Sequence, residues 1–262
     1  MFENKTVWIT GASSGIGEAL ALAMSKAGAR LILSARRVEE LERVKALCHQ
    51  PEHHLVYPLD MSDFEAVSRS VDQVKQWSPH LDIVIQNAGI SQRSLVKDTL
   101  FSVDEQIMRV NYLGVVAHSK AILPWFLEQG RGQFVVVSSL VGKFATPLRS
   151  AYSASKHALH GFFDALRAEL SSQNITVTIL CPGYINTQVS YNALLGDGSH
   201  QGKLDQAQAK GMAADQFSRR ALKVIAHHKA EAYIGGKETL GVLVHRLFPQ
   251  LFRFLIRRIK VT

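Results

Sequence analysis

The chain has 262 residues, 47% of them hydrophobic and 20% charged, which fits one globular domain with a sizeable buried core. Its only cysteines, Cys48 and Cys181, argue against a disulfide framework, so we expect reduced thiols in a cytoplasmic protein. No apolar run approaches the ~20 residues of a spanning helix, and the start lacks a signal-peptide pattern. We therefore expect at most a peripheral contact with a membrane.

The formal net charge of +8 is concentrated at one end of the chain. Residues 1–218 carry 20 basic and 20 acidic side chains, whereas residues 219–262 carry ten basic side chains and two acidic ones. Because no nucleic-acid recognition motif accompanies these basic residues, we do not expect nucleic-acid binding.

The first expected elements are a strand, a glycine-rich turn and a helix. Lys5–Thr10 is a short, β-rich apolar run, and Glu18–Ala27 is rich in helix formers and ends at Gly28. Between them lies Gly11-Ala-Ser-Ser-Gly15-Ile-Gly17. Glycines at such a turn permit a tight backbone, and the helix N-terminus offers unpaired N–H groups to a pyrophosphate. A lone pattern also fits an ordinary turn, but this setting favours a dinucleotide, and no Gly-Lys-Ser/Thr of a nucleotide triphosphatase follows.

The second expected strand, Arg30–Ser34, is followed by Ala35, Arg36 and Arg37. A dinucleotide-binding fold normally has an acidic residue here, which holds the ribose 2′-hydroxyl of NAD. A guanidinium would instead grip the 2′-phosphate of NADP through two hydrogen bonds. The sequence therefore favours NADP(H) over NAD(H), and a solvated arginine pair is the alternative.

Further apolar runs alternate with helical stretches along the chain. The expected strands are Val7–Thr10, Leu31–Leu33, His54–Tyr57, Ile83–Ile85, Phe134–Val137 and Thr176–Leu180. A capping box, Ser62-Asp-Phe-Glu65, is expected to open one of the helices. This alternation predicts the α/β class, as a single Rossmann-like domain over residues 1–262 with a doubly wound parallel sheet and helices on both faces. Its ligand should lie at the carboxyl ends of the strands.

Tyr152 and Lys156 are four residues apart on an expected helix, and Ser139 lies thirteen residues before the tyrosine. Side chains at i and i+4 share one helix face. A nearby ammonium favours the phenolate, so the tyrosine could exchange a proton near neutral pH. Lowering a phenol pKa from about 10 to ~7 requires about 4 kcal/mol, more than one lysine usually supplies, so a cationic cofactor ring is a natural helper. Taken alone, the pair also fits a surface tyrosine beside a solvated lysine.

His157 and His160 are helix neighbours among eleven histidines. A zinc site needs further ligands at suitable positions. Since no third ligand has a convincing spacing, we expect no metal site and assign both histidines to a helix surface or to the substrate side.

Together, these motifs strongly resemble those of the short-chain dehydrogenase/reductase family, over about Lys5 to Thr187. They are, in order, Thr10-Gly-Ala-Ser-Ser-Gly-Ile-Gly17, Asp60-Met61, Asn87-Ala-Gly89, Asn111, Ser138-Ser139, Tyr152-Ser-Ala-Ser-Lys156 and Pro182-Gly-Tyr-Ile-Asn-Thr187. The stretches that start at Val141 and Ser153 further resemble the "member 7" dehydrogenase/reductases, relatives of the 11β-hydroxysteroid dehydrogenases. One departure is Gln86, where the family usually has asparagine; we assign that position to support of the sheet.

The resemblance implies an NADP(H)-dependent oxidoreductase that interconverts a carbonyl and a secondary alcohol, with an apolar small molecule as its substrate. Tyr152 would be the general acid/base, Ser139 would hold the substrate oxygen, and Lys156 would lower the tyrosine pKa and bind the nicotinamide ribose. Asn111 would anchor a water that links Lys156 to solvent. The alternatives are a 3-oxoacyl thioester reductase of lipid synthesis and a non-catalytic dinucleotide sensor, and the complete Asn/Ser/Tyr/Lys set argues against the sensor.

The same resemblance implies where the cofactor lies. Asp60 would contact the adenine, Asn87–Gly89 would lie beside the adenosine ribose, and Ile185 and Thr187 would lie near the nicotinamide amide. The expected cofactor-binding residues are Gly11, Ser13, Ser14, Gly15, Ile16, Gly17, Arg36, Arg37, Asp60, Met61, Asn87, Ala88, Gly89, Tyr152, Lys156, Pro182, Gly183, Ile185 and Thr187.

The rest of the chain is expected to form a substrate lid, at about residues 188–218, and a basic amphipathic segment, at about residues 240–262. The apolar residues at helical spacing are Phe248, Leu251, Phe252, Leu255, Ile256 and Ile259. The basic residues between them are Arg253, Arg257, Arg258 and Lys260. Such a face could lie on an anionic membrane, cover the substrate mouth, dock on a second subunit of a homodimer or homotetramer, or pack on the protein's own core.

Overall fold

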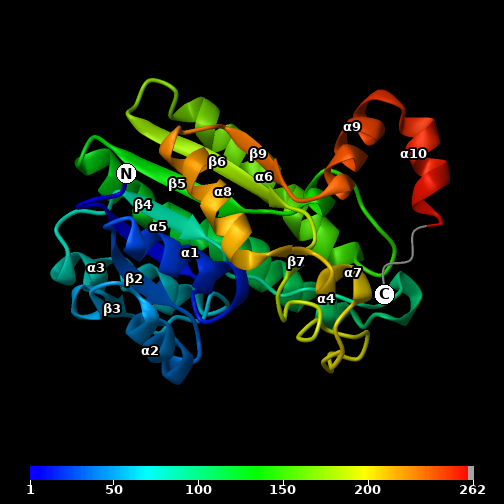
Figure 1. Ribbon diagram of the computed structural model, residues 1–262, viewed down its shortest axis with the longest axis horizontal. Coiled ribbons are helices and arrows are strands. Elements are labelled where there is room, and N and C mark those ends of the chain that lie inside the picture. The colour runs from blue at the N-terminus through cyan, green and yellow to red at the C-terminus, as the bar shows by residue number, and fades with distance from the viewer. Residues whose placement is uncertain (259–262) are drawn as a thin grey trace.

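The computed structural model describes residues 1–258 and has a parallel seven-stranded sheet between two layers of helices (Figure 1). The strands lie in the order β3-β2-β1-β4-β5-β6-β9. They are β1 (Thr6–Thr10), β2 (Arg30–Ser34), β3 (Leu55–Val56), β4 (Ile83–Gln86), β5 (Gly132–Val137), β6 (Ile175–Pro182) and β9 (Glu231–Ile234). A separate short pair joins β7 (Ile185–Asn186) to β8 (Met212–Ala213). The predicted fold class is confirmed.

The six predicted strands all form. The central ones are apolar runs that the parallel sheet buries on both faces, whereas β3 is a half-buried strand of two residues at the edge of the sheet. All five residues of β1, for example, are buried. The seventh strand, β9, was not predicted from the sequence. It lies at the edge of the sheet, where Tyr233 is exposed. Because an edge strand need not be apolar throughout, its short Glu-Ala-Tyr-Ile sequence lacks the continuous apolar run that identifies a central strand.

Helices cover both faces of the sheet (Figure 1). One face carries α1 (Gly15–Lys26), α2 (Val38–Leu47) and α8 (Ala214–Ala226). The other carries α3 (Phe64–Trp77), α4 (Phe101–Met108), α5 (Gly114–Glu128) and α6 (Ser150–Glu169). Alternate residues of β1 enter the two cores: Val7 and Ile9 pack with α1 and α8, whereas Trp8 packs with α3, α5 and α6. The strand order reverses between β1 and β4, the position where doubly wound folds bind ligands.

Two helix starts differ from the predictions. α1 begins at Gly15, inside the glycine loop, with Ser14 as its N-cap. α3 is capped by Asp63, whose Oδ1 accepts a hydrogen bond from Ala66 N at 3.0 Å. The predicted capping box at Ser62 is therefore wrong. The Ser62 hydroxyl donates to Asp60 Oδ1 at 2.7 Å instead, so it fixes the loop that follows β3.

Residues 187–211 form an irregular loop that contains the short helix α7 (Gln206–Ala209). A buried ion pair between Arg93 and Asp205 fastens this loop to the body of the domain. α8 begins at Ala214 and packs on α1, so the last residues assigned to the lid belong to a helix of the sheet layer.

Cys48 and Cys181 are free and buried. Within residues 1–258, no helix combines the length and the apolar character that crossing a bilayer requires.

The C-terminal segment forms a hairpin of α9 (Leu240–Leu247) and α10 (Pro249–Ile256) at one end of the molecule (Figure 1). Pro249 begins α10, which separates the segment into two short helices. Phe252 is buried against Phe144, with ring centroids 4.9 Å apart. Other large apolar side chains of the hairpin are exposed: Leu240, Leu243, Leu247, Phe248, Leu251, Phe254 and Leu255. Ile259 and Lys260, which the sequence analysis placed on this face, lie outside the described residues.

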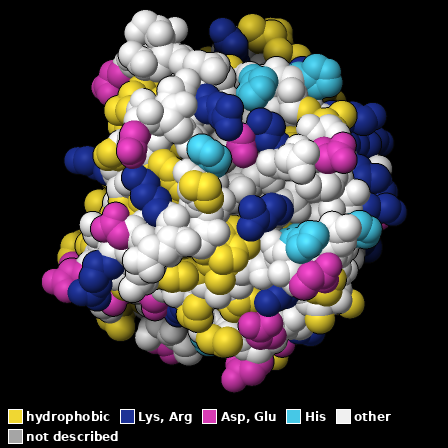
Figure 2. Space-filling view, turned by 90° about the vertical axis from the view of Figure 1, so that its left-hand side faces the viewer, with side chains coloured by type: hydrophobic (Ala, Val, Ile, Leu, Met, Phe, Trp, Pro, Cys, Tyr) yellow, Lys and Arg dark blue, Asp and Glu magenta, His cyan; other side chains and the backbone are white. Residues whose placement is uncertain are grey.

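At the end of the molecule away from the hairpin, basic and acidic side chains are interspersed (Figure 2). The exposed apolar surface of α9 and α10 differs from that face, because Arg246, Arg253, Arg257 and Arg258 flank it and no acidic residue follows Glu238. Contact of the hairpin with an anionic membrane or with a second subunit stays a prediction.

Candidate active site

The carboxyl ends of the central strands surround a cavity of about 910 Å³. Of the predicted cofactor-binding residues, all but Gly17 line it. Ser139 lines it as well, whereas Asn111 lies behind it. The predicted residues are therefore brought together by the loops that follow β1, β2, β3, β4, β5 and β6.

The glycine loop after β1 is too tightly packed to accept side chains. Gly11 and Gly15 have φ values of +66° and +60°, a left-handed conformation that L-residues with a Cβ rarely adopt. A Cβ on Gly17 would lie 2.1 Å from the Gly11 carbonyl oxygen, and one on Gly11 would lie 2.8 Å from Ala88 Cα. The loop therefore forms a close cradle at the N-terminus of α1. Ser14 makes no side-chain capping bond there, so backbone N–H groups remain available to a pyrophosphate.

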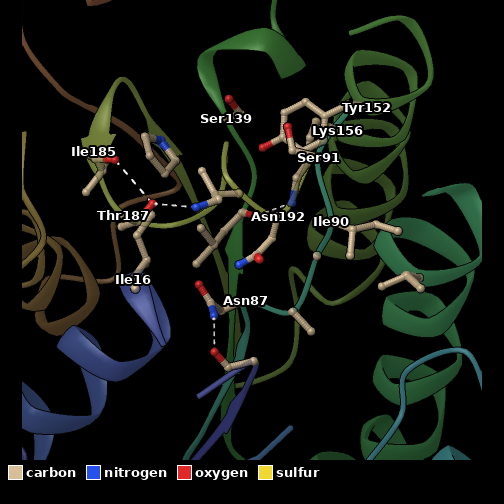
Figure 3. Close-up of a pocket in the computed structure, with 18 of the residues that line it drawn as sticks. Ile16, Asn87, Ile90, Ser91, Ser139, Tyr152, Lys156, Ile185, Thr187 and Asn192 are labelled. Carbon is tan, nitrogen blue, oxygen red and sulfur yellow. Dashed lines mark hydrogen bonds between the residues drawn. The ribbon is translucent and has the colours of Figure 1, made fainter. Parts of the chain in front are cut away.

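Asn87 fastens the glycine loop to the end of β4. Its Nδ2 donates to the carbonyl oxygens of Thr10 and Gly11 at 3.0 and 3.1 Å (Figure 3). The backbone N–H groups of Asn87 and Ala88 donate to Thr10 Oγ1. Asn87 thus holds the loop in place, and Ala88 and Gly89 form the adjoining wall of the cavity.

The cavity fits an extended dinucleotide. Arg36, Arg37 and Asp60 line one end, beyond the glycine cradle, and Ser139 and Tyr152 line the other. Both arginines are exposed, and neither forms an ion pair with any described residue. Asp60 is fixed by the Ser62 N–H and hydroxyl.

Ser139, Tyr152 and Lys156 come together at the substrate end of the cavity (Figure 3). Ser139 follows β5 and caps a short 3-10 turn, where its Oγ accepts a hydrogen bond from Val141 N at 3.3 Å. Tyr152 and Lys156 lie on the first turns of α6. The Lys156 Nζ donates to the Val137 carbonyl oxygen at 2.9 Å, so the ammonium is tied to the end of β5.

Asn111 lies in a π-helical turn, Arg109–Leu113, between α4 and α5. Such turns often mark functional sites, because they interrupt the helical hydrogen-bond ladder. Its buried side chain donates to the Ile90 carbonyl and to Ser155 Oγ and accepts from Ile90 N. A Cβ on Gly89 would lie 3.2 Å from Asn111 Oδ1 and 3.6 Å from Lys156 Nζ, so glycine keeps these two groups close. The water expected at Asn111 stays a prediction.

Burial raises the pKa of Tyr152, whereas Arg149, the Ser139 hydroxyl and Arg93 lower it by smaller amounts. Burial also lowers the pKa of Lys156 to about 8. The expected effect of Lys156 on the tyrosine pKa stays a prediction. The ammonium lies 5.8 Å from the centroid of the Tyr152 ring and points its hydrogen bond at the sheet.

Three charged residues that line the cavity were missed by the sequence analysis: Arg93, Arg149 and Glu238. Arg149 could have been found, because it lies only three residues before Tyr152, where it precedes the first turn of the expected helix. Glu238 accepts hydrogen bonds from Tyr184 N and Gly236 N and thereby shapes the turn after β6. A Cβ on Gly183 would lie 2.1 Å from Glu238 Oε1, so a side chain there would displace the Glu238 carboxylate from this turn.

The histidines behave differently from one another. His157 Nδ1 bonds to the Ser153 carbonyl of its own helix. His160 meets Cys181 and Glu231, and their potential ligand atoms lie within 4.8 Å of one another, a grouping that the spacing did not reveal. An ion there would compete with Lys143 Nζ, 2.8 Å from Glu231 Oε1, and with Ser138 Oγ, 3.1 Å from His160 Nε2.

Gln86 has the supporting role that we expected. It is buried at the end of β4, and its Nε2 contacts His118 Nδ1 and Ser119 Oγ on α5 at 3.0 and 3.1 Å. It therefore ties the sheet to α5 and does not line the cavity.

Solved structures resemble the whole chain. An alcohol dehydrogenase from the archaeon Thermococcus sibiricus, complexed with 5-hydroxy-NADP, has a TM-score of 0.76 and 27% identity, over 90% of this chain and 97% of that one. A short-chain dehydrogenase/reductase from Burkholderia phymatum, in complex with NAD, has a TM-score of 0.84 over 95% of each chain, and at 19% identity it speaks for the fold alone.

Sequence relatives cover nearly the whole chain. The dehydrogenase/reductase SDR family protein 7-like of Drosophila melanogaster is 44% identical over 260 residues, which are 97% of this chain and 80% of that protein. The dehydrogenase/reductase SDR family member 7B of Mus musculus is 40% identical over 255 residues, 95% and 79% of the two chains. The family model described as short chain dehydrogenase matches residues 5–195. This chain therefore belongs to the short-chain dehydrogenase/reductase family of oxidoreductases.

Proposed function

We propose that the protein is an NADP(H)-dependent oxidoreductase that interconverts a carbonyl and a secondary alcohol. The observation that carries this proposal is that one cavity is lined both by the glycine cradle at α1 and by Ser139, Tyr152 and Lys156. A dinucleotide laid along the cradle would bring its nicotinamide end to these side chains.

The bound nicotinamide supplies or accepts the hydride. In the direction of reduction, the Tyr152 hydroxyl gives its proton to the substrate oxygen, and in oxidation it takes that proton back. Burial raises the pKa of Tyr152, which keeps the phenol protonated at neutral pH and suits it to the proton-donating direction. The Ser139 hydroxyl donates a hydrogen bond to the same substrate oxygen and stabilises the charge that develops on it.

Lys156 holds the nicotinamide ribose. An ammonium has three N–H donors, and the Val137 carbonyl takes one of them. The remaining donors are free for ribose hydroxyls. Because Lys156 is anchored to β5, these donors keep a fixed position relative to Tyr152 on the same helix.

The preference for NADP(H) is supported by Arg36 and Arg37. Both line the adenosine end of the cavity where many dinucleotide folds place a carboxylate. A 2′-phosphate would find two guanidinium groups there and no acidic residue between Ser34 and Val38.

The test is NADPH consumption with a panel of ketones, comparing the wild type with Tyr152→Phe. The variant keeps the ring and loses only the titrating hydroxyl. We expect turnover to fall by about 10²- to 10⁴-fold, the usual contribution of a general acid. NADPH binding, followed by nicotinamide fluorescence, should be nearly unchanged. Residual turnover above about a tenth would refute the role of Tyr152, and a wild type that consumes no NADPH with any ketone would refute the proposed function.

A further inference from the structure

Three buried charged side chains lie together at the substrate end of the cavity: Arg93, Arg149 and Asp205, which are only 5%, 6% and 2% exposed. Arg93 Nε donates to Asp205 Oδ2 at 2.8 Å. Arg149 Nη2 lies 3.6 Å from the same oxygen. Two guanidinium groups therefore share one carboxylate, which leaves a net positive charge of about one in a poorly hydrated place.

The two arginines differ in how well they are hydrogen-bonded. Arg93 also donates through Nη1 to Ser91 Oγ and to the Gln92 carbonyl, so most of its donors are used. The Arg149 side chain makes no hydrogen bond with any residue of the described chain, and its Nε is completely buried without a partner. A buried guanidinium whose N–H groups lack hydrogen-bond acceptors is costly even beside a carboxylate, so such donors are normally found with an acceptor.

The backbone around Arg149 also holds this residue at the start of α6. It is the N-cap residue of α6, three residues before Tyr152, and both side chains line the cavity. The preceding Leu148 has a φ of +65°, a left-handed conformation that is strained for a bulky residue. The start of α6 adds the positive end of its helix dipole. The one acidic side chain nearby that also lines the cavity, Glu238, already accepts two backbone hydrogen bonds.

We infer that Arg149, supported by the Arg93–Asp205 pair, binds an anionic oxygen group of the substrate, a carboxylate or a phosphate close to the reacting carbonyl. This inference rests on the proposed function and names its substrate class. A guanidinium presents two parallel donors that match either anion. Phe144, Phe252 and Leu194 line the same part of the cavity, so the remainder of the substrate is apolar.

The first experiment compares anionic ketones with neutral analogues that keep the same carbonyl group. The carboxylate pair is 4-oxopentanoate and its methyl ester, and the phosphate pair is hydroxyacetone phosphate and methoxyacetone. We expect the wild type to have a kcat/KM at least about tenfold higher for one anionic member than for its neutral partner, the usual size of a charge-assisted contact. The pair that shows the preference identifies the anion. Equal kcat/KM values within both pairs would overturn the inference while leaving the proposed function intact.

Variants separate anion binding from an effect on Tyr152. Arg149→Met keeps the length of the side chain and should raise KM for the anionic ketone by about 10- to 100-fold, with a smaller change for its neutral partner. Arg149→Lys should restore part of the preference. Arg220→Met removes an exposed arginine of α8 and is the matched control. An equal loss of kcat for both ketones, without a selective rise in KM, would mean that Arg149 acts only through the tyrosine.

A binding measurement keeps the inference testable without turnover. Calorimetry of the protein–NADP⁺ complex should show binding of pentanoate or of methyl phosphate, weaker binding of pentanamide, and loss of the anion signal in Arg149→Met. Equal binding of the anions and the amide would overturn the inference, whatever the outcome with ketones.

Discussion

The Nζ atom of Lys156 donates to the Val137 carbonyl oxygen at 2.9 Å, and it lies 5.8 Å from the centroid of the Tyr152 ring. The lysine is therefore a buried cation anchored to the sheet. Burial raises the pKa of Tyr152, and the nearby charges that lower it belong to Arg149, at the start of α6, and to Arg93, in the loop after β4.

Because the pKa of Lys156 is lowered, we expect the protein's stability against unfolding to rise with pH. Burial lowers the pKa of Lys156 from 10.5 to about 8. Between these two values the unfolded chain binds a proton that the folded chain has released, so the free energy of unfolding rises with pH across this window. We expect the melting temperature of the cofactor-free wild type to rise relative to Lys156→Met between about pH 7.5 and 9.5. If the melting temperatures of the two proteins changed in the same way with pH, Lys156 would not titrate in this range.

Because the glycine cradle is tightly packed, we expect alanine to have opposite effects at Gly17 and at Gly161. Gly17→Ala would place a Cβ 2.1 Å from the Gly11 carbonyl oxygen, so the loop must move and NADPH affinity should be lost. Gly161, in the middle of α6, has no described atom within 4 Å of its Cβ position. Gly161→Ala should therefore keep NADPH affinity and add about 0.5–1 kcal/mol of helix stability.

Fluorescence titration of NADPH and thermal melts of both glycine variants measure these effects. Normal NADPH affinity in Gly17→Ala would contradict the packing of the cradle.

Much of this site follows from the sequence because its motifs are local. The strand, glycine turn and helix are contiguous, and Tyr152 and Lys156 are joined by one helix turn. Continuous apolar runs such as Val7–Ile9 identify central strands, since a parallel sheet buries both of their faces.

The remainder depends on contacts between distant residues. Arg93, Arg149 and Asp205 come from three loops, and sequence spacing contains no information about which carboxylate the arginines share. Ser62 and Asp63 are both suitable N-cap residues at the start of α3. Asp63 caps the helix because the Ser62 hydroxyl donates its hydrogen bond to Asp60. The environment of Lys156 likewise depends on the Val137 carbonyl, nineteen residues away.

The cofactor preference predicts different effects on the two dinucleotides. Arg36→Ala should weaken NADP(H) binding by about 10- to 150-fold, the range for a charge-assisted contact, and should change NAD(H) binding much less. Adding Ala35→Asp should favour NAD(H) further, because a carboxylate repels the 2′-phosphate. Titration of both cofactors against each variant measures the ratio. Equal weakening of the two cofactors by Arg36→Ala would contradict the preference.

The C-terminal hairpin contains one apolar side chain that lines the cavity and several that are exposed on the surface. Phe252 lines the cavity and packs on Phe144, whereas Leu247, Phe248 and Leu251 are at least half exposed and lie outside the cavity. Replacing those three by serine should leave ketone kinetics unchanged. Phe252→Ala is the matched contrast and should raise KM for bulky ketones and lower the melting temperature, because it opens a space beside Phe144.

The triple serine variant also tests the predicted contact with anionic membranes. The wild type should sediment with phosphatidylserine vesicles at low salt and less so at high salt, since exposed arginines act through screened charges. Vesicles of phosphatidylcholine are the control for charge. The triple variant keeps every arginine but loses apolar surface that would enter the headgroup region, so its vesicle binding should fall. Unchanged sedimentation of the triple variant, with vesicles and alone, would mean that this apolar surface contacts neither a membrane nor a second subunit.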